Sequence, residues 1–313
     1  MTLKIFLRLV EIQTKIASLI PFLLGILFSL YYFNQIDWTN TVLFFIAMLV
    51  FDMTTTAINN LMDYQKAKDK KYKQEVNVIG QSGLAEKTVI QLILGMLVVS
   101  TLIGLVLVLR TNFLLLLMGG VAFFIGIFYT FGPIPISRTP LGEILSGLTM
   151  GFGIFFITLF VNDVNNILIQ LQFDHPEFLL SGNYIEILST FLVSLPTVFL
   201  IANIMLANNT CDLEQDITNH RFTLPFYIGK KQAVILFNIL MYSSYGVILL
   251  AVLLRLLHPI LLGTFLTLPL IKRNLDQFNK RQVKEETFVV AIKNTVLFSV
   301  VEIVLLGLSL FFV

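Results

Sequence analysis

The sequence predicts an all-helical integral membrane protein with about nine transmembrane helices around a central cavity and a cytoplasmic N-terminus. Three observations predict this class: the composition, the spacing of the apolar segments, and the distribution of lysine and arginine. Of the 313 residues, 57% are hydrophobic and 13% are charged, and the mean hydropathy is +0.87. A water-soluble domain carries roughly a quarter charged residues. Most of the surface of this chain is therefore expected to face lipid.

Nine apolar segments meet or approach the roughly 20 residues that a helix needs to cross a bilayer core about 30 Å thick. They are 14–33, 41–63, 88–109, 112–131, 141–162, 187–209, 232–254, 258–272 and 289–312. The eighth is the shortest and contains Pro259 and Pro269. Since no separate soluble domain interrupts the series, residues 1–313 are expected to form a single polytopic membrane domain.

The basic residues test this count, because lysine and arginine concentrate in cytoplasmic loops. With the N-terminus inside, the predicted outer loops hold only Arg110 and Arg255 of the 21 lysines and arginines. The longest outer loop, 163–186, contains acidic residues and no basic one. The pattern predicts a multi-pass protein of the cell membrane. A net charge of +2 gives no indication of a nucleic-acid partner.

Two polar motifs, both reading Asn-Asn-x-x-Asp, end the second and sixth segments. Residues four apart on a helix share a face, so Asn59 projects with Asp63 at the end of the second segment. Asn208, Asp212 and Asp216 make the same kind of stripe at the end of the sixth. Carboxylate and amide oxygens suit Mg²⁺, which also bridges to substrate phosphates. The two faces, at one membrane level, predict a magnesium–diphosphate clamp across a cavity.

Each of these residues also has a more ordinary interpretation. A single Asp or Asn at the inner end of a membrane helix is most often solvated, and membrane topology alone explains the lysines of 66–73. Glu143 is either a site residue or a carboxylate favoured by the dipole at the start of the fifth helix. Arg221 is suited to bind diphosphate oxygens in a fork. The joint occurrence of both motifs, each followed by basic residues, favours a site.

At these residues the chain resembles the UbiA superfamily of intramembrane prenyltransferases, which has nine transmembrane helices and aspartate-rich motifs ending helices 2 and 6. The spacing from Asp63 to Asp69 resembles that of the 1,4-dihydroxy-2-naphthoate branch. The stretches Tyr-Thr-Phe-Gly-Pro at 129–133 and Leu-Gly-Glu at 141–143 resemble the signature of the same branch. One departure is Asn60, which stands where the family usually has Asp. Losing that charge is expected to weaken metal binding, and Asn60→Asp to keep or raise activity at low magnesium.

The resemblance implies an enzyme that uses Mg²⁺ to transfer a polyprenyl group from its diphosphate to dihydroxynaphthoate. Loss of CO₂ would give a demethylmenaquinol, a step of menaquinone biosynthesis, in a site open to the cytoplasm. The implied metal ligands are Asn59, Asp63, Asn208, Asp212 and Asp216. The implied catalytic residues are Asp63, Asp69, Asp212, Asp216 and Tyr129, whose ring face would stabilise the allylic cation. The implied substrate-binding residues are Asn59, Asn60, Lys68, Arg138, Asn208, Arg221 and Glu143.

Two alternatives stay open from the sequence. Within the same class, the acceptor could be 4-hydroxybenzoate or a haem, and only the resemblance of the stretches 129–133 and 141–143 argues against it. A transporter or flippase is the rival from another class. Such a protein places ionisable groups near the bilayer midplane, whereas here they are expected to cluster at one surface, with the deep parts of the helices nearly free of charge.

Overall fold

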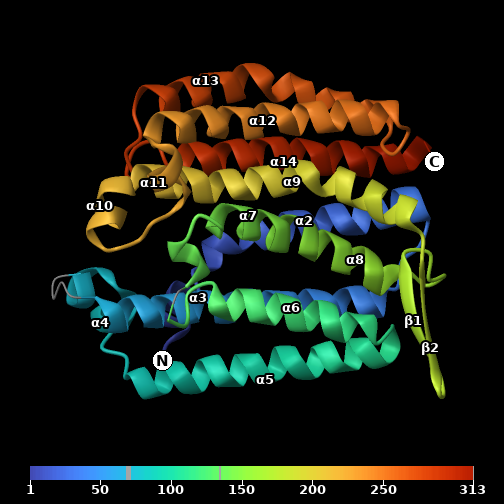
Figure 1. Ribbon diagram of the computed structural model, residues 1–313, viewed down its shortest axis with the longest axis horizontal. Helices are drawn as coiled ribbons and strands as arrows, with labels where there is room; N and C mark the ends of the chain where they lie inside the picture. Colours follow the sequence, from blue (N-terminus) through green and yellow to red (C-terminus); the bar gives the residue numbers. More distant parts are fainter. Residues whose placement is uncertain (68–71, 134, 313) are drawn as a thin grey trace. The chain divides into compact units, whose positions relative to one another are not determined.

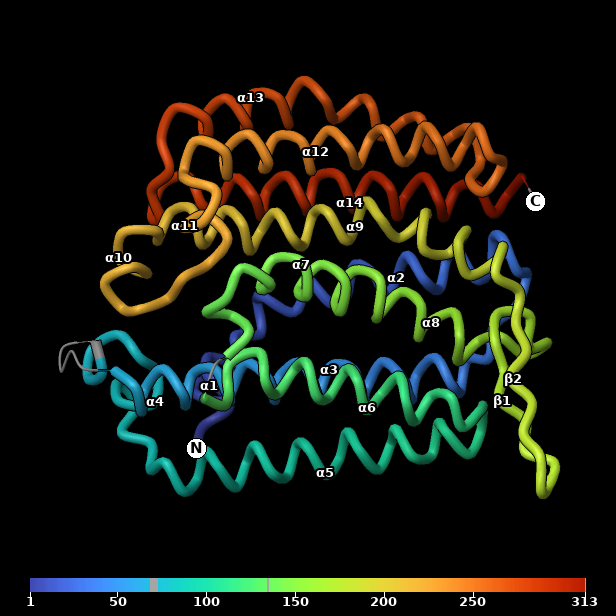
Figure 2. Tube along the Cα trace, in the orientation of Figure 1, coloured from blue at the N-terminus to red at the C-terminus, as the bar shows by residue number. Residues whose placement is uncertain are grey.

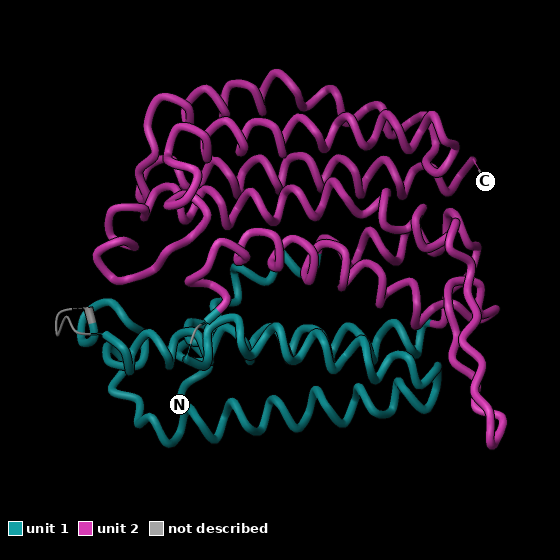
Figure 3. The backbone as a smooth tube through the Cα atoms, in the orientation of Figure 1, with its two compact units in different colours: residues 1–19, 38–135 teal, residues 20–37, 136–313 magenta. Residues whose placement is uncertain are grey.

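The protein is almost entirely helical (Figure 1), and its trace (Figure 2) divides into two compact units (Figure 3). The computed structural model describes residues 1–67, 72–133 and 135–312. Unit 1 consists of Met1–Leu19 and Trp38–Pro135, and unit 2 of Ile20–Asp37 and Ile136–Val313. The expectation of a single polytopic domain stays a prediction.

Unit 1 is built on two long helices, α3 and α5, which pack side by side. Its elements are α1 (Leu3–Leu9), η1 (Ile12–Lys15), the first residues of α2 (Ile16–Phe28), α3 (Trp38–Lys66), η3 (Tyr72–Val76), α4 (Val78–Gln81), α5 (Glu86–Arg110) and α6 (Leu114–Phe128). The helix α6 packs closely on α3, where Phe123 stacks on Phe51 with 4.0 Å between ring centroids. A Cβ on Gly126 would lie 2.8 Å from the Phe51 ring, so a larger residue there would displace this ring.

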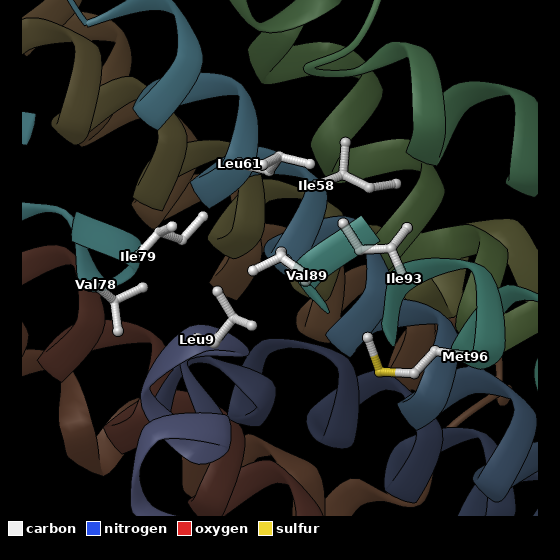
Figure 4. Packing of buried hydrophobic residues seen from close by; sticks show 9 residues of the cluster. Leu9, Ile58, Leu61, Val78, Ile79, Val89, Ile93 and Met96 are labelled. Atoms are coloured by element: carbon white, nitrogen blue, oxygen red, sulfur yellow. The ribbon is translucent and has the colours of Figure 1, made fainter. Parts of the chain in front are cut away.

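A cluster of buried apolar side chains fixes the end of α3 that carries the first polar motif (Figure 4). Leu9 of α1, Ile79 of α4 and Val89 of α5 are each at most 1% exposed and contact this end of α3. Ile58 and Leu61, on either side of the Asn59–Asn60 pair, belong to the same cluster. Burial of a large aliphatic side chain stabilises by about 1.5–3 kcal/mol. The motif therefore sits on a packed helix end and not on a frayed one.

Unit 2 contains the remaining helices and a small hairpin. Its elements after α2 are η2 (Ser29–Phe33), η4 (Ile136–Arg138), α7 (Gly142–Ser146), η5 (Gly147–Gly153), α8 (Ile154–Asn162), β1 (Ile169–Asp174), β2 (Glu177–Gly182), α9 (Tyr184–Cys211), α10 (Leu213–Thr218), α11 (Leu224–Ile228), α12 (Lys230–Leu253), η6 (Pro259–Thr267), α13 (Leu268–Lys280), α14 (Val289–Ser309) and η7 (Leu310–Phe312). The helices α12 and α14 both pack against α9 (Figure 2). A Cβ on Gly151 of η5 would lie 2.6 Å from the Val198 Cα, so glycine lets η5 meet the α9 backbone.

Within the described ranges, seven helices are long and apolar enough to cross a membrane. They are Ile12–Phe33, Trp38–Lys66, Glu86–Arg110, Gly142–Asn162, Tyr184–Cys211, Lys230–Leu253 and Val289–Phe312. The predicted segment 112–131 forms the shorter α6, and the predicted segment 258–272 forms the 3₁₀ helix η6 followed by α13. Every predicted apolar segment is therefore helical in a multi-pass membrane protein. Crossing by the fourth and eighth segments, and the orientation of the N-terminus, stay predictions.

The predicted outer loop 163–186 contains an antiparallel hairpin that the sequence analysis did not anticipate. Strand β1 pairs with β2 in a register that places Ile169 opposite Gly182 and Asp174 opposite Glu177. Ile169, Leu171 and Phe173 alternate with polar residues, a period of two that is typical of a strand. This alternation was the available signal for the hairpin.

Candidate functional site

In unit 2, the end of α9 and the segment after α13 bring together two predicted site residues, Asn208 and Asp212, and one that was not predicted, Lys284. Asn208 and Asp212 lie one helical turn apart, and both accept hydrogen bonds from the ammonium of Lys284. The Lys284 Nζ lies 2.5 Å from the Asp212 Oδ2. The Lys284 and Asp212 side chains are 37% and 22% exposed. The two oxygens predicted as metal ligands thus already converge on one positive charge.

Asp216, one turn further on, sits in the short helix α10 beside two arginines. The Arg221 Nε lies 3.3 Å from the Asp216 Oδ1, and the Arg221 backbone N–H donates to the Asp216 carbonyl at 2.8 Å. The carbonyl of Arg138 accepts from the Phe222 N–H at 3.1 Å, which ties Arg138 to the same loop. The Asp216 side chain is 5% exposed, and its Oδ2 has no hydrogen-bond partner among the described residues. Burial raises the pKa of Asp216, and the charge of Arg221 opposes this.

Glu143 is held by the second asparagine of the α9 motif. The Asn209 amide donates to the Glu143 Oε1 at 2.8 Å, and both residues are buried, at 1% and 3% exposure. The Glu143 Oε2 has no hydrogen-bond partner within the described part of the chain. Glu143 does lie in the first turn of α7, but its carboxylate also links α7 to α9. A buried carboxylate oxygen left without a donor is costly, which makes Glu143 a candidate for contact with a ligand.

In unit 1, the corresponding asparagine of α3, Asn60, hydrogen-bonds to the N-terminal segment. The Asn60 amide donates to the Leu9 carbonyl at 3.0 Å and to the Glu11 Oε1 at 3.2 Å. Its own backbone carbonyl accepts from the Asn77 amide at 3.0 Å. Both hydrogens of the Asn60 amide are therefore used within the protein, and a carboxylate at this position could supply neither. The role of Asn60 in substrate binding stays a prediction.

The remaining predicted residues of unit 1 lie near the end of α3. Asn59 and Asp63 are partly buried and one turn apart on that helix. Tyr129 follows the last residue of α6, which packs on α3 and ends at the same end of the unit (Figure 1). Lys68 and Asp69 lie outside the described residues. Asn59 and Asp63 belong to unit 1 and the other predicted ligands to unit 2, so joint action on one ligand stays a prediction.

A largely buried ion pair joins Lys15 of η1 to Asp52 in the middle of α3, where the sequence predicts almost no charge. The Lys15 Nζ lies 2.6 Å from the Asp52 Oδ1 and donates to the Thr56 Oγ1 at 2.6 Å. The other carboxylate oxygen, Asp52 Oδ2, accepts from the Ser18 hydroxyl at 2.6 Å. Glu302 is also buried within α14, at 3% exposure. The deep helices are therefore less free of charge than expected. The signal for Asp52 was its place seven residues before Asn59 on the same face of the helix.

The oxygen donors of unit 2 suit a hard divalent cation. Among the described residues, no group of three or more His, Cys, Asp or Glu side chains is placed to hold a metal ion. Mg²⁺, however, is usually held by one or two carboxylates together with waters and substrate phosphates. Asn208 and Asp212 already gather around the ammonium of Lys284, and Asp216 has an unpartnered oxygen. These residues fit Mg²⁺ bound together with a phosphate.

Residues 18–292 match the UbiA prenyltransferase family. The chain belongs to this family. The resemblance predicted from the two polar motifs is thus confirmed, and it now covers most of the sequence and both units. Family membership places the chain among the prenyltransferases. The match does not by itself assign a role to any one residue.

This UbiA-family chain is similar to one curated relative and to several solved structures. It is 28% identical over 297 residues to the 1,4-dihydroxy-2-naphthoate octaprenyltransferase of Bacillus subtilis (strain 168), covering 93% of this chain and 87% of the relative. A UbiA homologue of Archaeoglobus fulgidus bound to GPP and Mg²⁺ is 15% identical, with a TM-score of 0.64 and coverage of 99% and 100% of the two chains. The UbiA homologue of Aeropyrum pernix K1 is 17% identical, with a TM-score of 0.67 and coverage of 93% and 98%. At such low identity the solved structures support the fold alone.

Proposed function

We propose that this protein transfers a polyprenyl group from polyprenyl diphosphate to 1,4-dihydroxy-2-naphthoate with loss of CO₂, giving demethylmenaquinol for menaquinone biosynthesis. The observation that carries the proposal is the end of α9, where Asn208 and Asp212 accept hydrogen bonds from the Lys284 ammonium, next to the Asp216–Arg221 pair. The named activity of the Bacillus subtilis relative supports the choice of acceptor. We place the enzyme in the cell membrane with its site open to the cytoplasm.

Binding of the prenyl donor, polyprenyl diphosphate, is assigned to the charged groups around α10. Arg221 has a partly exposed side chain beside Asp216, and a guanidinium binds phosphate oxygens by parallel hydrogen bonds. Arg138 is fixed to the same loop and adds a second positive charge. Lys68 is expected to assist them. These cations hold the diphosphate and oppose the charge that it gains as it leaves.

Asn59, Asp63, Asn208, Asp212 and Asp216 are the residues that would hold Mg²⁺, with Asp69 in support. When bound, Mg²⁺ neutralises the negative charge that develops on the departing diphosphate. The bond between the allylic carbon and the diphosphate oxygen breaks, and the ring carbon that bears the carboxylate attacks the allylic carbon. The carboxylate then leaves as CO₂, and its electron pair restores the aromatic ring.

Two further residues are assigned to steps that follow binding. Tyr129 offers its ring face to the allylic cation, an interaction that contributes about 2 kcal/mol or more where water is excluded. Glu143 has a buried carboxylate oxygen that lacks a donor within the described residues, and it is assigned to orienting the hydroxyl groups of the acceptor. Asn60 is assigned to support of the site through its contact with the N-terminal segment.

The experiment that tests the proposal is a turnover assay on purified protein in lipid, with Mg²⁺, farnesyl or geranylgeranyl diphosphate, and one of two acceptors. Dihydroxynaphthoate is expected to give a magnesium-dependent, decarboxylated prenyl product, identified by mass. Product from 4-hydroxybenzoate alone would overturn the acceptor and keep the reaction class. Folded protein without product from either acceptor, with longer donors also tried, would overturn the enzymatic proposal and favour the transport alternative.

A further inference from the structure

Lys284 connects the segment between α13 and α14 to the end of α9. It lies 72 positions after Asp212 in the sequence, yet its ammonium donates to both Asp212 and Asn208. The same ammonium lies 4.9 Å from the centre of the Phe288 ring. In the sequence, nothing distinguishes Lys284 from the other basic residues of the predicted inner loops, because membrane topology alone explains a lysine there.

The contact of Lys284 conflicts with the binding of a metal ion to the same oxygens. A divalent cation on Asp212 and Asn208 would stand in contact with the ammonium, and like charges a few ångströms apart repel strongly in a partly buried site. The carboxylate of Asp212 is also already neutralised by Lys284. The ammonium therefore has to leave these two oxygens when a metal ion binds there.

The displaced ammonium has both the freedom to move and a new partner. Its side chain is 37% exposed, and its four-carbon stem is flexible. A diphosphate that arrives with the metal ion brings several negative oxygens to the same place, and an ammonium is a compact point charge that binds phosphate well. Turning from Asp212 to the diphosphate replaces one charge-assisted hydrogen bond by another.

We propose that Lys284 binds the prenyl donor: its ammonium holds Asn208 and Asp212 before the donor binds and turns to the diphosphate when the metal–diphosphate complex binds. This inference rests on the proposed function, because it needs a diphosphate substrate. The segment 281–288, which lies outside both polar motifs, thereby takes part in substrate recognition. Two opposite effects follow: Lys284 weakens the binding of metal alone and strengthens the binding of metal with diphosphate.

The first test measures both effects in a variant. Lys284→Gln is expected to bind Mn²⁺ alone more tightly than the unmodified protein, followed by electron paramagnetic resonance. With Mg²⁺ present, it is expected to bind farnesyl thiodiphosphate, which resists ionisation, roughly tenfold or more weakly, since a charge-assisted hydrogen bond is lost. Lys284→Arg keeps the charge and should retain most of this affinity. Arg281→Gln is the matched control, because Arg281 lies in the same segment and pairs with Glu286 at 3.2 Å.

The second test uses the unmodified protein and does not depend on the folding of a variant. The rate at which acetic anhydride labels Lys284, read by mass spectrometry relative to Lys280, should rise when Mn²⁺ alone is added. It should fall below the starting rate when Mg²⁺ and the thiodiphosphate are added together. A labelling rate that neither ligand changes would overturn the inference.

The remaining outcomes separate this inference from the proposed function. If Lys284→Gln weakened both kinds of binding equally, Lys284 would be only a structural residue and the inference would be wrong. Unchanged thiodiphosphate binding in Lys284→Gln would also overturn it, while leaving the proposed function intact. If the unmodified protein bound no thiodiphosphate and gave no product in the turnover assay, both would fall together.

Discussion

The two Asn-Asn-x-x-Asp motifs use their second asparagine in the same way, although they lie in different units. In unit 1 the Asn60 amide donates to the Glu11 carboxylate, and in unit 2 the Asn209 amide donates to the Glu143 carboxylate. In each unit, a glutamate from another segment is thereby fixed to the end of a long helix. In both motifs, the second asparagine thus anchors another segment, whereas the first asparagine and the aspartate are the proposed metal ligands.

This comparison gives a physical reason for the unusual Asn60. An aspartate there would set a carboxylate against the Glu11 carboxylate and against the Leu9 carbonyl. The loss of negative charge, read from the sequence as a weakened metal site, is compensated by two hydrogen bonds that fix the N-terminal segment. The structure therefore gives grounds to expect a harmful effect of Asn60→Asp, where the sequence suggested a neutral or favourable one.

The two motifs differ in the depth of the polar face that leads to them. On α3 the face continues inward from Asn59 through Thr56 to Asp52, which pairs with Lys15. On α9 the position equivalent to Asp52 is the buried Ile201. The first motif thus ends a polar stripe anchored by an ion pair, whereas the second has no charged residue at the equivalent depth and takes its positive charge from Lys284 near the surface.

The largest effect is expected from breaking the ion pair of unit 1. Lys15→Met leaves Asp52 uncompensated with its side chain only 15% exposed, and removal of one partner of a buried pair costs about 3–5 kcal/mol of unfolding free energy. Equilibrium unfolding in mixed detergent micelles measures this cost. Lys4→Met, at an exposed position, is the control. Recovery of most of the loss in the double variant Lys15→Met/Asp52→Leu is also expected. A Lys15→Met variant as stable as the control would remove the asymmetry between the two units.

The next largest effect concerns the aspartates that the two motifs share. Asp63→Asn and Asp212→Asn keep the shape and remove one charge each, and a direct metal ligand is expected to cost about 100-fold or more in turnover. The prenyl product formed per minute measures this, with the exposed Asp174→Asn as the control. If the double variant lost no more than one single variant, the two aspartates would act on one bound ligand. Full activity in either single variant would disprove its role as a ligand.

A smaller effect on stability is expected at the second asparagine of each motif. Asn60→Asp and Asn209→Asp should each cost about 1–3 kcal/mol, because a hydrogen bond that is partly buried at Asn60 and fully buried at Asn209 becomes a repulsive contact between oxygens. Glu11→Gln should recover part of the loss in Asn60→Asp, and Glu143→Gln part of that in Asn209→Asp. Thermal unfolding in detergent checks all four variants. Stability unchanged in Asn60→Asp would show that the contact with Glu11 is not an anchor.

The smallest effect is a dependence on pH in unit 2. Burial raises the pKa of Asp216, so the folded protein takes up this proton at a higher pH than the unfolded chain does. Donor binding is expected to weaken as the pH falls through this raised pKa, because the ligand carboxylate becomes neutral. The contribution to folding has the opposite sign, and it is lost as the pH rises through the same pKa. Arg221→Gln should move the acidic limb of donor binding to higher pH, and an unmoved limb would exclude Asp216 as its source.

The sequence was sufficient for those features that repeat over many residues. Apolar segments of membrane length predicted where helices form, and residues four apart predicted the pairing of Asn208 with Asp212. Contacts between distant segments left no such pattern. Lys284 is one lysine among many, and nothing local relates it to Asp212. Lys15 and Asp52 were each visible in the sequence, but only the packing of the N-terminal segment on α3 shows that they neutralise each other.

The ion pair between Lys15 and Asp52 also bears on how the chain enters the bilayer. A lone lysine or aspartate at the centre of a membrane helix costs about 2.5–3.5 kcal/mol during insertion. Here the opposite charges belong to the first two long apolar helices in the chain, within Ile12–Phe33 and Trp38–Lys66. These two segments follow one another in the sequence and are made before the later helices. Asp52 therefore has its counter-ion in the segment made just before its own, and it does not have to wait in lipid for a partner from the later helices.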